Sequence, residues 1–203
     1  FRCYDKCNIK FMNIQIYGRR KRKIAKKICV IKTSLRYNSN SDQLADPFIQ
    51  GAKESGNSIE EISLKDQDIA FCKGCLACLK SGECVIRDDA NSITEQIKQA
   101  DVIVWATPIY YYEKSGQMKV MIDRANSLYE TDYQFRDVYL LSTAAENEDG
   151  VDHRALNGLK GWVACYPKSH FVGSVFAGGV DESNTIKDHP ALKKVYEIGK
   201  AIQ

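Results

Sequence analysis

Residues 28–41 read ICVIKTSLRYNSNS, and this stretch holds the pattern that decides the fold. Its first four residues are continuously apolar and mostly β-branched, which is typical of a β-strand covered on both faces. The stretch from Thr33 to Ser41 is polar, and a helical spacing of apolar residues follows it until Gly56 supplies a C-cap. A buried strand, a polar loop and a helix in this order predict one unit of a parallel α/β sheet.

The same alternation recurs along the rest of the chain. Further strands are predicted at 59–64, 101–106, 137–142 and 171–176. Further helices are predicted at 89–100, 115–128, 151–166 and from Pro190 to about Ile202, and Pro108 is expected to end the third strand. Five buried strands that alternate with five helices predict a three-layer α/β sandwich, in which a parallel sheet carries helices on both faces.

Composition fits a single soluble domain rather than a membrane or disordered protein. The chain has 203 residues, of which 44% are hydrophobic and 27% charged. No apolar run approaches the roughly 18 residues of a membrane span, and no secretory segment is recognisable, so no membrane partner and a cytoplasmic location are expected.

The positive charge is concentrated at the start of the chain. The first 27 residues hold ten basic residues against Asp5 alone, although the whole chain has a net charge of only +3. Residues 1–25 are therefore predicted to be a basic, solvated extension outside the core domain at 26–203. A nucleic-acid partner is not expected, because such proteins spread positive charge over a folded face.

Three loops are expected at the carboxyl edge of the sheet, where open α/β sheets bind their ligands. The loop at 33–41 combines hydroxyls, a helix start and Arg36, a set suited to an anion, although Ser39 could equally serve only as a helix N-cap. It contains neither G-x-G-x-x-G nor a P-loop pattern. The loop at 107–112 brings three tyrosines that could pack against a flat ring or merely cover apolar surface, and the loop at 142–145 brings small residues.

Four of the eight cysteines lie within 13 residues, as Cys72, Cys75, Cys78 and Cys84. In a reducing compartment this crowding indicates metal, cluster or redox chemistry rather than structural disulfides. Four thiolates are the ligand set of a [4Fe-4S] cluster. Uncoordinated thiols and a structural zinc ion are the alternatives.

Taken together, these motifs resemble those of the NAD(P)H-dependent FMN reductase and iron-sulfur flavoprotein family, a branch of the flavodoxin-like superfamily. The resemblance covers roughly residues 27–202. Its motifs are S-x-R-x-x-S-N-S at 34–41, C-x-G-C-x-x-C-x5-C-V-I-R-D-D at 72–89, A-T-P-I-Y at 106–110 and K-x-x-I-D-R at 119–124. The resemblance implies a sheet order of 2-1-3-4-5, FMN as cofactor, NAD(P)H as co-substrate, and a homodimer or homotetramer.

The resemblance also implies which residues would hold FMN. Residues of the first loop would bind its phosphate: Ser34, Arg36, Ser39, Asn40 and Ser41. Residues of the other two loops would flank its isoalloxazine ring: Thr107, Pro108, Ile109, Tyr110, Tyr111, Ser142 and Thr143. Asp123 and Arg124 match the family too, but their spacing favours a structural ion pair over a ligand contact. The Tyr111-Tyr112 pair departs from relatives that carry one bulky and one small residue.

Two redox functions remain open at this point, beside a non-enzymatic domain in which the four cysteines hold a structural zinc ion and the first loop binds some other anion. The chain could be an oxidoreductase that passes electrons from NAD(P)H through FMN to a small acceptor such as a quinone, a nitro compound or a flavin. Alternatively, it could be an iron-sulfur flavoprotein that carries electrons to a redox protein. In either case the chemistry belongs to the flavin, so no side chain is expected to act as a catalytic acid or base.

Overall fold

The structure, a computed structural model, describes residues 25–129 and 131–203. Apart from Ala25, the predicted basic extension therefore lies outside the described residues. Within the described part of the chain, no helix is long and apolar enough to cross a membrane.

Five parallel strands form the sheet in the order β2-β1-β3-β5-β6. Numbered along the chain, these five strands have the predicted order 2-1-3-4-5, so the predicted fold class is confirmed. The strands are β1 (Lys27–Lys32), β2 (Ser58–Ser63), β3 (Val102–Tyr110), β5 (Asp137–Thr143) and β6 (His170–Ala177).

One strand was not predicted. Strand β4 (Glu113–Lys114) pairs antiparallel with the end of β3, where Ile109 faces Lys114. The expectation that Pro108 ends the third strand was wrong, because β3 continues to Tyr110 and folds back through this hairpin. Pro108 is tolerated near the strand end, where few ladder hydrogen bonds remain to be made.

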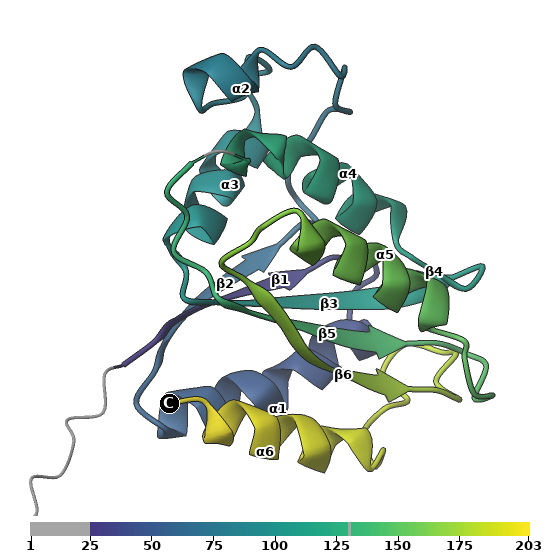
Figure 1. Ribbon diagram of the computed structural model, residues 1–203. Helices are drawn as coiled ribbons and strands as arrows, with labels where there is room; N and C mark the ends of the chain where they lie inside the picture. Colours follow the sequence, from purple (N-terminus) through teal and green to yellow (C-terminus); the bar gives the residue numbers. More distant parts are fainter. Residues whose placement is uncertain (1–24, 130) are drawn as a thin grey trace, which may run out of the picture.

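Helices cover both faces of the sheet (Figure 1). Helices α1 (Asn40–Glu54) and α6 (Ala191–Ala201) lie on one face. Helices α3 (Asp89–Gln99), α4 (Gly116–Arg124) and α5 (His153–Ala164) lie on the other, together with the 3₁₀ helix η1 (Ala125–Leu128). The short helix α2 (Cys78–Ser81) lies beyond these layers, on the cysteine-rich segment.

Strand β1 shows why two separate cores form. Ile28 and Val30 pack towards α1 and α6, whereas Cys29 and Ile31 pack towards α3, α4 and α5. Successive side chains of a strand point to opposite faces, so a strand buried on both sides is continuously apolar. Burial raises the pKa of the Cys29 thiol to about 12, with a smaller contribution from Glu60, so this cysteine is a packing residue.

Two glycines allow α1 and α6 to approach each other closely. A side chain at Gly51 would meet the backbone of Tyr196, and one at Gly199 would meet the carbonyl of Phe48. The contact fixes α6 against α1, whose first turn faces the carboxyl edge of the sheet.

Candidate functional site

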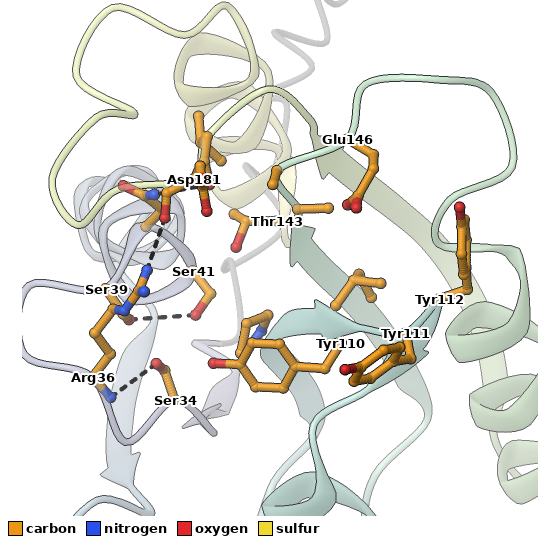
Figure 2. A pocket seen from close by; sticks show the side chains of 16 residues that line it. Ser34, Arg36, Ser39, Ser41, Tyr110, Tyr111, Tyr112, Thr143, Glu146 and Asp181 are labelled. Atoms are coloured by element: carbon orange, nitrogen blue, oxygen red, sulfur yellow. Dashed lines mark hydrogen bonds between the residues drawn. The ribbon is translucent and has the colours of Figure 1, made fainter.

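A cavity of about 370 Å³ opens at the carboxyl ends of β1, β3, β5 and β6 (Figure 2). We refer to it as the strand-end cavity. Its volume lies within the usual range for small-molecule sites. Strand order reverses between β1 and β3, since β1 connects to β2 on one side and β2 then connects to β3 on the other. Ligands of open parallel sheets bind at this type of switch point.

Ten of the twelve predicted cofactor residues line the strand-end cavity. They are Ser34, Arg36, Ser39, Asn40, Ser41, Pro108, Ile109, Tyr110, Tyr111 and Thr143. The other two, Thr107 and Ser142, are fully buried and do not line it. The Thr107 hydroxyl accepts a hydrogen bond from the Ser115 amide at 3.1 Å, and the Ser142 hydroxyl lies 3.3 Å from a carboxylate oxygen of Asp152. These two residues fix the loops that follow β3 and β5.

The loop after β1 presents hydroxyls and a helix start to one end of this cavity. Ser39 is the N-cap of α1, and its hydroxyl accepts from the Asp42 amide at 3.2 Å. The buried hydroxyls of Ser34 and Ser41 face the same space (Figure 2). Backbone N–H groups at a helix N-terminus attract anions, so this end suits a phosphate.

Arg36 adds a cation at the same end. Its guanidinium donates one hydrogen bond to the Asp181 carbonyl, at 2.8 Å, and is otherwise exposed. The other donors of the guanidinium fork are therefore available for oxygen atoms of an anion.

Asn40 has a different role from its neighbours. Its side-chain amide donates to the carbonyls of Val180 and Glu182, at 3.2 and 2.8 Å. Its side-chain oxygen accepts from the amides of Thr185 and Ile186, at 3.0 and 3.3 Å. Because these bonds use both ends of the amide, Asn40 holds residues 180–186 against the cavity, leaving it little capacity for a ligand.

The opposite end of the strand-end cavity is aromatic. Tyr110, Tyr111 and Tyr112 lie in the β3–β4 hairpin, and Tyr111 is 95% exposed. Tyr111 and Tyr112 have positive φ angles of 49° and 66°, which a two-residue hairpin requires but which Asn-Gly adopts more easily. The hairpin thus presents aromatic rings at positions where the turn alone favours small residues.

Six residues outside the predicted cofactor set also line this cavity: Tyr112, Ala144, Ala145, Glu146, Val180 and Asp181. The last two follow β6, a strand whose loop the sequence analysis did not consider. A signal was present in Gly178-Gly179, just after a predicted strand. A side chain at Gly178 would clash with the Glu146 carbonyl and with Asn147, so the glycine lets the loops after β5 and β6 meet.

The four predicted metal ligands surround a second cavity, of about 400 Å³. We call it the cysteine cavity, and it shares no lining residue with the strand-end cavity. Cys72 and Cys75 are exposed, whereas Cys78 and Cys84 are half-buried. Among residues 25–129 and 131–203, no three His, Cys, Asp or Glu side chains converge closely enough for one metal ion.

The ligand chemistry of the cysteine cavity fits a cluster better than a single ion. A [4Fe-4S] cluster has four thiolate ligands, each on its own iron, so its ligands surround a group rather than meet at one point. A tetrahedral zinc ion needs all four sulfurs about 2.3 Å from one centre. The four cysteines line one cavity without converging on one point, so the thiolates that they offer match the first ligand set.

Arg124 and Asp123 make two separate ion pairs rather than one with each other. Lys119 pairs with Asp123 at 2.7 Å on the exposed side of α4. Arg124 pairs with Asp88 through both carboxylate oxygens, at 2.5 and 2.7 Å, and both side chains are buried. Burial alone would raise the pKa of Asp88, but the hydrogen bond and charge of Arg124 and the Ala70 amide hold it below the ordinary value.

The fold and the strand-end cavity together define a class of protein. A doubly wound parallel sheet with this strand order, and with a cavity at its switch point, is of flavodoxin-like type. Residues 26–182 match the family model of NADPH-dependent FMN reductase. The chain therefore belongs to this family of FMN-dependent NAD(P)H oxidoreductases.

Individual relatives agree with this assignment. An iron-sulfur flavoprotein of Methanosarcina thermophila is 25% identical over 87% of this chain and 93% of its own length. One from Archaeoglobus fulgidus is 34% identical over 45% of this chain, and the match spans only 41% of that relative. The solved NAD(P)H:quinone oxidoreductase from Methanothermobacter marburgensis has a TM-score of 0.68 at 15% identity, covering 89% of this chain and 100% of that one, which shows a shared fold.

Proposed function

We propose that the strand-end cavity binds FMN and that the chain passes electrons from NAD(P)H to a small diffusible acceptor. Ser34, Ser39 and Ser41 donate hydrogen bonds to the phosphate, and Arg36 supplies the compensating charge. When bound there, FMN would supply the redox chemistry, which is hydride transfer from a nicotinamide and onward transfer of the electrons.

In this proposal the protein's own residues bind FMN and orient its ring. Pro108, Ile109 and Thr143 present strand-end backbone and side-chain atoms to the ring, while Tyr110 and Tyr111 offer aromatic surface. Asn40 keeps residues 180–186 in place, and Thr107 and Ser142 fix the neighbouring loops from behind. No side chain needs to transfer a proton to the substrate.

One observation carries this proposal: a hydroxyl-rich helix start with an arginine and an aromatic hairpin lie at opposite ends of one cavity. FMN has a matching layout, with a charged phosphate at one end and a flat heterocycle at the other. Because Tyr111 is exposed, the aromatic end of the strand-end cavity is open to solvent. This favours an electron acceptor that diffuses into the cavity.

Purification of the chain followed by acid release of any bound flavin tests the cofactor. The expected results are a yellow protein with about one FMN per chain and steady NADH or NADPH oxidation in the presence of a quinone, a nitro compound or free flavin. A colourless chain that fails to bind added FMN would overturn the proposal.

A second candidate function rests on the cysteine cavity. Four cysteines around one cavity favour a [4Fe-4S] cluster, which would release electrons one at a time to a redox protein. Two relatives named iron-sulfur flavoproteins support this candidate. Anaerobic preparation with iron and sulfide analysis separates the two functions: about four irons and four sulfides per chain are expected for the carrier, and none for a flavin-only reductase.

We also propose assembly into a homodimer or homotetramer. Leu35 and Phe71 are exposed apolar side chains that line one surface pocket, and the exposed Tyr37 ring contacts Lys65, which lines the same pocket. Exposed apolar patches of this kind mark contact surfaces. Light scattering coupled to size-exclusion chromatography measures the assembly directly, and a monomer at all concentrations would exclude it.

A further inference from the structure

The cysteine-rich segment joins the rest of the fold at two points, Ala70 before Cys72 and Ile86 after Cys84. We refer to these two points together as the neck. Residues 71–85 between these points are mostly exposed. A segment of this length with little packing of its own keeps a defined shape only if its two ends are fixed.

One guanidinium spans the neck. Arg124 donates to the Ala70 carbonyl at 2.8 Å and to the Ile86 carbonyl at 3.1 Å, and only 2% of the residue is exposed. Its donors therefore bridge the two chain segments of the neck, and one of them also reaches the side-chain oxygen of Asn91 on α3, at 3.3 Å. An arginine fork can do this, whereas the compact ammonium of a lysine cannot reach both carbonyls and Asp88 together.

Asp88 completes the clamp from the other side. Besides its two contacts with Arg124, its carboxylate accepts from the Ala70 amide at 2.9 Å and from the Ala90 amide at 3.1 Å. Asp88 is thus the N-cap of α3 and a partner of the neck at once. The buried pair is fully hydrogen-bonded on its carboxylate side, the condition under which buried charges are tolerated.

The segment that carries Arg124 also contacts one of the cysteines. Asn126 donates to the sulfur of Cys78 at 3.3 Å. Arg124 and Cys84 both line the cysteine cavity. Residues 124–126 therefore provide a donor to one of the four sulfurs and a guanidinium in the cavity that all four cysteines line.

Arg124 has one donor left over. It lines the cysteine cavity, and its Nε–H is buried with no acceptor among the described residues. Buried donors are almost always paired, so an unpaired one beside a cavity indicates an acceptor that the protein alone does not provide.

We propose that Arg124 and Asn126 are positioning residues for a sulfur-rich group held by Cys72, Cys75, Cys78 and Cys84. Arg124, fixed by Asp88, holds the neck so that the first and last cysteines stay at the cavity, and Asn126 orients the Cys78 sulfur. The inference deepens the second candidate function, the iron-sulfur carrier, and is independent of FMN binding.

The test compares the full chain with Arg124→Lys and Asn126→Ala after anaerobic reconstitution with iron and sulfide. Arg87→Lys is the matched control, because Arg87 lies in the same segment but makes an exposed pair with Glu83. Iron and sulfide content, release of iron to a chelator, reduction potential by spectroscopic titration and FMN content are measured on each sample.

Arg124→Lys is expected to lose iron to the chelator about 10- to 100-fold faster than wild type, as for other residues that orient metal ligands. Asn126→Ala is expected to keep its iron but to have a lower reduction potential, because a donor to sulfur stabilises the more negative, reduced state. FMN content should stay unchanged in both variants, and Arg87→Lys should match wild type throughout.

Wild-type release rates in Arg124→Lys together with an unchanged potential in Asn126→Ala would overturn the inference. A wild-type chain that takes up no iron and sulfide would overturn it as well, while leaving the flavin proposal intact. If Arg124→Lys is insoluble, the potential of Asn126→Ala decides the outcome alone.

Discussion

The strand-end cavity and the cysteine cavity are held in place by different means. The first is built from short loops at the ends of four adjacent strands, so sheet register places its residues within reach of one another. The second lies between one long segment outside the layers (Figure 1) and residues of α4, η1 and α5, and the ends of that segment meet at a buried ion pair. We infer that the strand-end cavity keeps its shape after one substitution better than the cysteine cavity does after the loss of Arg124.

The largest expected effect is therefore at Arg124. Arg124→Ala leaves Asp88 buried without its partner, and breaking such a pair costs about 3–5 kcal/mol of unfolding free energy. Urea denaturation of the metal-free chain measures it. Arg87→Ala, which removes an exposed pair in the same segment, should stay within about 0.5 kcal/mol. Equally small losses of unfolding free energy in both variants would show that the ion pair between Arg124 and Asp88 does not stabilise the neck.

A smaller loss is expected at Asn40. Asn40→Ala removes the hydrogen bonds of Asn40 to the Val180 carbonyl and to the Thr185 and Ile186 amides, while the Glu182 carbonyl keeps its bond from the Thr185 hydroxyl, and the loss should cost about 1–3 kcal/mol. Hydrogen exchange at the Thr185 and Ile186 amides should accelerate in parallel. Unchanged exchange at these two amides would show that residues 180–186 are held by other contacts.

Substitution of Arg36 should change the affinity for FMN more than the stability of the fold. Arg36→Ala removes a charged donor from the phosphate end, so the Kd for FMN should rise roughly tenfold or more, with little change in stability. Lys65→Ala is the control, since Lys65 packs on Tyr37 nearby but does not line the strand-end cavity. Fluorescence titration with FMN measures both variants, and equal Kd values would remove Arg36 from the site.

The smallest effect is expected at the exposed cysteines. In the metal-free chain, Cys75→Ser should change the unfolding free energy by less than about 0.5 kcal/mol, because the thiol makes few contacts. Cys29→Ser places a hydroxyl in an apolar core and should cost about 1–3 kcal/mol. Thermal denaturation distinguishes the two variants. A larger loss of stability in Cys75→Ser than in Cys29→Ser would mean that the cysteine-rich segment is packed in solution.

The same difference explains what could be predicted from sequence. Continuous apolar runs reveal strands buried on both faces, and alternation with helices leaves little choice of topology, so the parallel sheet was predictable. Loops that follow such strands must meet at one edge, and ten of the twelve residues expected there do line one cavity. Their roles toward a ligand remain a proposal.

Other features could not be predicted because they depend on contacts distant in sequence. The partner of Arg124 is 36 positions away, and no local pattern distinguishes Asp88 from Asp89 as that partner. Asn40 has the sequence context of a phosphate ligand, and only the position of residues 180–186 shows that its amide is already engaged. The hairpin turn at Tyr111 and Tyr112 has positive φ angles, but the sequence gives no turn signal there, since neither residue is Gly or Asn.

The bonds made by Asn40 also bear on the order in which the molecule forms during synthesis. Asn40 and Val180 are 140 positions apart, and α6, which packs on Gly51, comes later still. Contacts so distant in sequence close late in folding, because the intervening chain must be ordered first. A ribosome-bound chain that has exposed only β1 and α1 thus holds the hydroxyls that we propose for phosphate binding without the wall that encloses them. Tight cofactor capture should therefore wait until residues 180–201 have emerged and docked.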